Sequence, residues 1–130
     1  MVRRDADQED GMRVDINGSG KIQISLPKAD YNKYAMLVKR PAYESILNTM
    51  IVLPALIWAF ENIRLSEEFY ETNKDARWLK SINIVLEGSN LSLTPESIDR
   101  SSSFELAQNL LGMPLDRSLD GLSDIGEEIE

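Results

Sequence analysis

The side chains of this chain that could take part in catalysis are carboxylates, lysines and tyrosines, because its 130 residues include no histidine and no cysteine. The absence of histidine excludes Ser-His-Asp catalysis and removes the commonest transition-metal ligand. The absence of cysteine excludes thiolate nucleophiles, thiolate metal sites and disulfides. The densest carboxylate cluster consists of Glu67, Glu68, Glu71 and Asp75. Metal-carboxylate bundles draw ligands from several helices, so we expect a solvated helix face here, and no catalytic residue, metal or cofactor.

A second candidate is the segment 15–22, whose side-chain oxygens lie on Asp15, Asn17 and Ser19. Over these eight residues it resembles the calcium loops of EF-hand and dockerin modules. However, Leu26 occupies the twelfth position, where such loops need a bidentate carboxylate. We therefore interpret the segment as a tight turn and expect no specific calcium binding.

The elements that hold these residues begin with a β-hairpin. Residues 13–16 and 21–26 alternate between polar and apolar types, and Asn-Gly-Ser-Gly at 17–20 is typical of a turn. Residues 30–40 fit either a helix or a strand, and Ala, Met, Leu and Lys favour the helix.

The most apolar segment is an unbroken run of eleven residues at 50–60. It is too short to cross a bilayer, which needs about 20 apolar residues. A helix from Pro41 to Arg64 that contains it should be buried on nearly every side. Pro54 predicts a kink, or two helices that meet there. The side chains expected to be nearly inaccessible are Met50, Leu53, Leu56, Ile57 and Phe60.

Helix-start patterns follow at Ser66, at Thr94-Pro95-Glu96 and at Ser102, and residues 78–86 are apolar at helical spacing. The predicted fold class is α+β: an N-terminal β-hairpin packed on a small bundle of three to four helices, with one fully buried central helix. We expect residues 1–11 to be a disordered tail or linker. Residues 12–115 should form one globular domain, and 116–130 an acidic, partly disordered tail.

The charge of the chain limits the kinds of partner that it is expected to bind. A net charge of −8 disfavours nonspecific binding to nucleic acid or to an anionic membrane. Acidic residues follow Arg3 and Arg4 where the apolar part of a signal peptide would lie, so we expect a cytoplasmic protein.

The sequence therefore favours a non-enzymatic interaction or assembly module, either a homodimer or the C-terminal domain of a larger protein. The expected interface residues are apolar side chains of two helices: Trp58, Phe60, Trp78, Leu79 and Ile82. The alternative is a small acidic inhibitor that binds a basic, nucleic-acid-binding partner protein. An aromatic ligand pocket near Trp58 and Trp78 is a further alternative.

Overall fold

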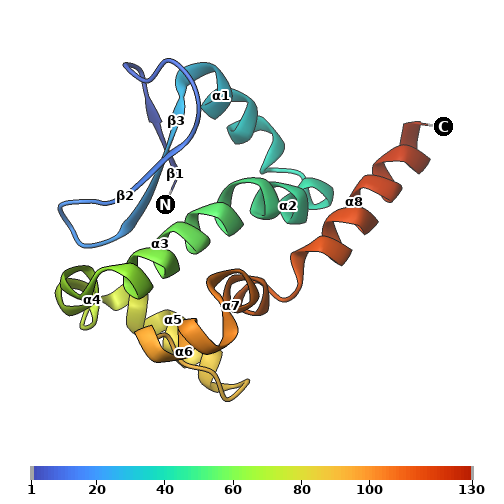
Figure 1. The fold of residues 1–130 in the computed structure, drawn as a ribbon. Coiled ribbons are helices and arrows are strands. Elements are labelled where there is room, and N and C mark those ends of the chain that lie inside the picture. The colour runs from blue at the N-terminus through green and yellow to red at the C-terminus, as the bar shows by residue number, and fades with distance from the viewer. Residues whose placement is uncertain (1, 130) are drawn as a thin grey trace.

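The computed structural model describes the backbone of residues 2–129 and the side chains of residues 2–126. Over these residues the fold is α+β: one three-stranded sheet and seven helices, if the continuous helix 41–65 counts as one (Figure 1). The prediction of three to four helices was therefore too low. The elements are β1 (Val2–Asp5), β2 (Arg13–Ile16), β3 (Ile22–Pro27), α1 (Lys28–Leu37), α2 (Pro41–Leu47), the π-helix η1 (Asn48–Val52), α3 (Leu53–Leu65), α4 (Glu67–Asn73), α5 (Arg77–Glu87), α6 (Pro95–Ser101), α7 (Ser103–Leu110) and α8 (Pro114–Ile129).

The sheet contains more of the chain than expected. Strands β2 and β3 pair antiparallel, with Val14 opposite Ile24, and β1 pairs parallel to the other edge of β3. Residues 2–5 are thus a strand rather than a disordered tail. The buried Gln8 side chain also ties down the segment, because its Nε2 donates to the carbonyl oxygens of Gly11 (2.6 Å) and Ser25 (3.1 Å).

The long helix 41–65 separates two apolar cores. On one side, Leu47, Ile51 and Ala55 pack against Ile24 and Leu26 of β3. On the other side, Leu53, Leu56, Ala59, Phe60 and Ile63 meet apolar side chains of α5, α6 and α7 and of the loop between α5 and α6. The helix is not buried all round, since Met50 is 64% exposed and Ile57 is only partly buried. An apolar run on every face of a helix needs partners on every face, and the sheet and α5–α7 leave one strip uncovered.

Pro54 disturbs the long helix without dividing it. The π-helix η1 ends just before it, and the Leu53 N–H donates to the Asn48 carbonyl, five residues back. Proline has no N–H to continue the normal ladder. The expected irregularity therefore appears as a π turn within one continuous helix.

Helix α8 occupies the segment that was expected to be an acidic, partly disordered tail. It packs against α2, and the Gly121 backbone comes so close that a Cβ there would lie 2.7 Å from the Ala42 carbonyl oxygen. The Ser118 hydroxyl donates to the Ser45 carbonyl oxygen (2.9 Å) and lies 2.6 Å from the Thr49 hydroxyl. Small residues on both helices permit this close packing. Beyond α2, the rest of α8 projects from the body of the molecule (Figure 1).

One helix of the described residues, Pro41–Leu65, is long and apolar enough to span a membrane, with a mean hydropathy of 1.6. Within the protein, 39% of its most apolar window is buried. Core helices of water-soluble proteins pass the same test of length and composition, so this finding assigns no location.

Candidate interaction site

The apolar residues expected at an interface lie in or against the larger core. Phe60 is 0% and Leu79 2% exposed, which leaves them no surface for a partner. Trp58, Trp78 and Ile82 are partly buried against the same core. The Trp58 ring meets Phe69 edge to face, with 5.9 Å between ring centroids. These residues therefore stabilise the contact between α3, α4 and α5 rather than form one accessible face.

The carboxylate cluster of α4 is solvated, as expected. Glu67, Glu68, Glu71 and Asp75 are all exposed. The Lys74 ammonium lies 2.7 Å from a Glu71 carboxylate oxygen, and this hydrogen bond raises the pKa of Lys74. Within the described residues, no group of three or more acidic, histidine or cysteine side chains could hold a metal ion.

The turn that resembles a calcium loop uses one of its oxygens internally. The Asn17 Oδ1 atom accepts hydrogen bonds from the backbone N–H groups of Ser19 (2.9 Å) and Lys21 (3.1 Å). Gly20 has a φ of +74°, which suits glycine in a tight turn. These bonds make Asn17 the organiser of the hairpin turn.

A polar link between α3 and α7 was not predicted from the sequence. The Glu61 carboxylate accepts from Arg64 at 2.7 Å and from the buried Ser103 hydroxyl. The bonds from Arg64 and then Ser103 lower the pKa of Glu61, so the carboxylate is favoured. These partners make Glu61 a structural group that joins two helices.

The leucine stripe of α8 is the best candidate for an interaction surface. We use this name for Leu115, Leu119 and Leu122, which are 59%, 54% and 54% exposed. At about 100° per residue they fall within roughly 60° of one another around the helix. Their spacing of four and then three residues is that of a helix–helix seam.

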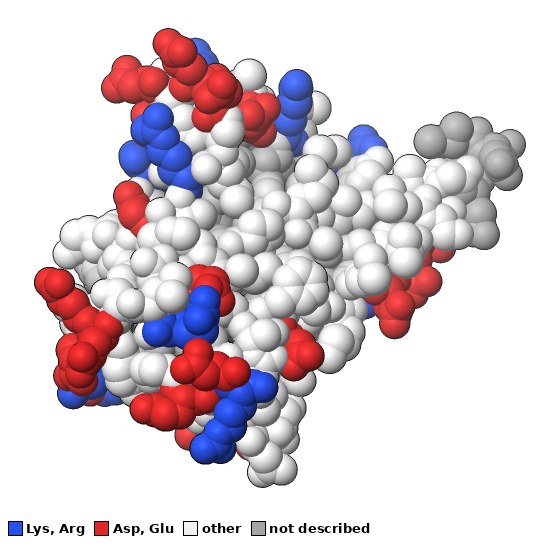
Figure 2. Space-filling model, viewed as in Figure 1, with Lys and Arg blue, Asp and Glu red and all other residues white. Residues whose placement is uncertain are grey.

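The stripe lies between the α2 contact and an acidic face. Ser118 and Gly121, which touch α2, lie roughly 100° to one side of the stripe, and Asp116, Asp120 and Asp124 lie on the other side. Figure 2 shows acidic side chains along the lower edge of the α8 arm and an uncharged surface over its front. The apolar sector of α8 is therefore wider than α2 can cover.

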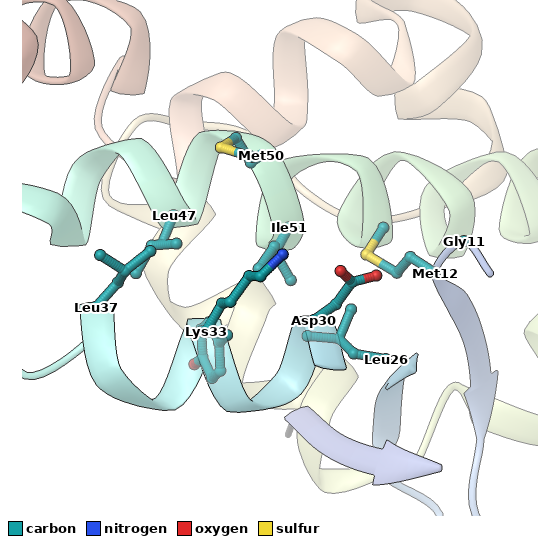
Figure 3. A pocket seen from close by; sticks show the side chains of 10 residues that line it. Gly11, Met12, Leu26, Asp30, Lys33, Leu37, Leu47, Met50 and Ile51 are labelled. Carbon is teal, nitrogen blue, oxygen red and sulfur yellow. The ribbon is translucent and has the colours of Figure 1, made fainter. Parts of the chain in front are cut away.

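A second apolar surface is a pocket of about 470 Å³ where β3, α1, α2 and η1 meet (Figure 3). Its floor consists of Leu26, Leu47 and Ile51, which are all buried. Asp30 and Lys33 of α1 are its charged lining residues. The pocket thus combines an apolar floor with one acid and one base.

No known protein family, curated protein or solved structure matches this chain. The surfaces of the protein itself are therefore the basis on which its function is inferred.

Proposed function

We propose that this protein is a non-enzymatic assembly module that forms a homodimer through the leucine stripe of α8. The observation that carries the proposal is the exposure of three leucines at seam spacing on a helix that α2 covers on only one side. In water, exposed leucines in such a row favour a contact that buries them.

The chemistry of α8 favours a protein partner over a lipid surface. Helices that lie in a membrane interface carry Lys and Arg beside their apolar face. The face beside the leucine stripe instead carries Asp116, Asp120 and Asp124. Anionic lipid headgroups would repel these carboxylates.

A second copy of the chain is the occupant that best fits the stripe. In an antiparallel pair of α8 helices about a two-fold axis, Leu115 of each copy would lie near Leu122 of the other, with the two Leu119 side chains at the centre. Such isologous contacts are the commonest form of symmetric assembly. The flanking aspartates would remain solvated at the edge, where they disfavour a shifted register. Because each copy contributes few leucines, we expect a weak and reversible dimer.

The alternative, an acidic inhibitor of a basic protein, has less support from the charge distribution. Arg64 pairs with Glu61 and approaches Asp99 at 3.8 Å, and Lys74 pairs with Glu71. These cations interrupt the acidic surface that such an inhibitor would present to its target.

The test compares the solution mass of two aspartate variants by light scattering. Leu119→Asp places a charge at the centre of the stripe and should keep the protein monomeric. Ile84→Asp makes the same kind of change on α5, at a side chain that is 70% exposed, and should leave the dimer intact. Equal dimerisation of the two variants would contradict the proposal.

A further inference from the structure

We propose a second binding site, independent of the leucine stripe: the pocket against η1 binds a small uncharged amphiphile. Its volume of about 470 Å³ falls within the range of about 300–1,000 Å³ typical of small-molecule sites. Three parts of the pocket indicate the class of ligand: its apolar floor, its mouth with Asp30 and Lys33, and the wall formed by η1.

The floor selects an apolar body. Leu26, Leu47 and Ile51 are 6%, 7% and 9% exposed, so they are fixed by the surrounding core rather than free to collapse into the space. Met12 and Met50 border the same space and offer flexible thioether side chains. An alkyl or aryl group placed there would replace water against apolar surface.

The mouth selects the head group. Figure 3 shows the Lys33 side chain extending from α1 toward Ile51, and the Asp30 carboxylate pointing toward Met12. Neither side chain makes a hydrogen bond or ion pair elsewhere in the described part of the chain. A carboxylate ligand would be attracted by Lys33 and repelled by Asp30. An ammonium ligand would be attracted by Asp30 and repelled by Lys33. A hydroxyl or amide can accept from Lys33 and donate to Asp30, so an uncharged head group suits both.

The wall formed by η1 is the least regular part of the long helix. It contributes Met50 and Ile51 to the pocket. A π turn is rare and occurs frequently at functional sites, because its extra residue changes the direction of the side chains around it. Met50 of this turn lines the pocket and is 64% exposed.

The experiment uses methyl NMR of the methionines during titration with 1-octanol, octanoate or octylammonium. 1-Octanol should shift the methyl signals of Met12 and Met50 in a saturable manner, and should leave Met113, which lies outside the pocket, unchanged. We expect octanoate and octylammonium to bind about tenfold more weakly.

Charge variants test the head-group assignment. Asp30→Asn should raise the affinity for octanoate, and Lys33→Gln should raise that for octylammonium, each by about tenfold. Leu37→Trp would fill the mouth at a residue that is 37% exposed and should abolish octanol binding, whereas Ile84→Trp, on α5, should not. Equal affinity for the three probes, shifts at Met113 as large as those at Met12, or no saturable shift would each overturn the proposal. Leu119→Asp should leave octanol binding unchanged, so the two proposals can fail separately.

Discussion

At the scale of single residues, apolar side chains of the same long helix differ in how much they contribute to the stability of the fold. Phe60 of α3 is 0% exposed, because it packs against the later helices. Met50, ten residues earlier in the same long helix, is 64% exposed. Phe60→Ala should destabilise the fold by about 3–5 kcal/mol, because it leaves a cavity. Met50→Ala should change the free energy of unfolding by no more than about 0.5 kcal/mol. Urea unfolding followed by circular dichroism measures both values, and similar losses for the two variants would contradict the assigned burial.

Glu61 should make the stability depend on pH. Its hydrogen bonds from Arg64 and Ser103 lower its pKa in the folded state below the ordinary value of 4.5. Folding is therefore favoured by the ionised form above pH 4.5, and this contribution is lost as the pH falls through the lowered pKa. The stability difference between the wild type and Glu61→Gln should shrink as the pH is lowered from 7 toward 3. A difference that stays constant over that range would rule out this role.

At the scale of elements, local patterns predicted those helices that begin with a side-chain cap. Ser66 accepts a hydrogen bond from the Phe69 N–H at 3.1 Å, and Thr94 accepts one from the Ser97 N–H at 3.2 Å. Such caps join residues three apart, so the sequence alone contains both partners. The helix favoured for 30–40 is also present, as α1.

The elements missed by the sequence analysis depend on distant partners. Strand β1 needs the edge of β3, and α8 packs against α2. The polar composition of β1 and the acidic composition of α8 hid both segments, and the small residues through which α8 touches α2 lie outside its apolar spacing. The spacing of Leu115, Leu119 and Leu122 was visible, but their exposure depends on which face α2 covers. For the same reason, the sequence alone could not show whether Phe60 and Leu79 are buried in the core or exposed at an interface.

Two glycines of α8 test its docking on α2. A Cβ at Gly121 would lie 2.7 Å from a backbone oxygen, whereas one at Gly126 would have nothing within 4 Å. Gly121→Ala should therefore destabilise the docked helix by about 1–3 kcal/mol, as overpacking does. Gly126→Ala should stabilise α8 by about 0.5–1 kcal/mol, because alanine favours helix.

Amide hydrogen exchange along α8 measures both effects separately from global unfolding. Faster exchange is expected in Gly121→Ala and slower exchange in Gly126→Ala. If both substitutions slowed exchange equally, the close contact with Ala42 would be wrong.

At the scale of the whole molecule, net charge and exposed apolar surface have opposite effects on the association of two copies. The chain carries a net charge of −8, so two copies repel at long range, and salt screens that repulsion. Moderate salt should leave an apolar dimer unchanged or stronger. An acidic inhibitor should instead bind its basic target more slowly as salt rises. Salt dependence therefore separates the two functional hypotheses.

The most direct test of the central claim is the solution mass of the unmodified chain, measured by light scattering at several protein and salt concentrations. The proposal predicts that the mass rises with protein concentration from 14.7 kDa toward twice that value. Added salt should preserve or increase the dimer. A mass that stays at 14.7 kDa at high protein concentration, with and without salt, would contradict the assignment of the α8 leucine stripe as a dimer interface.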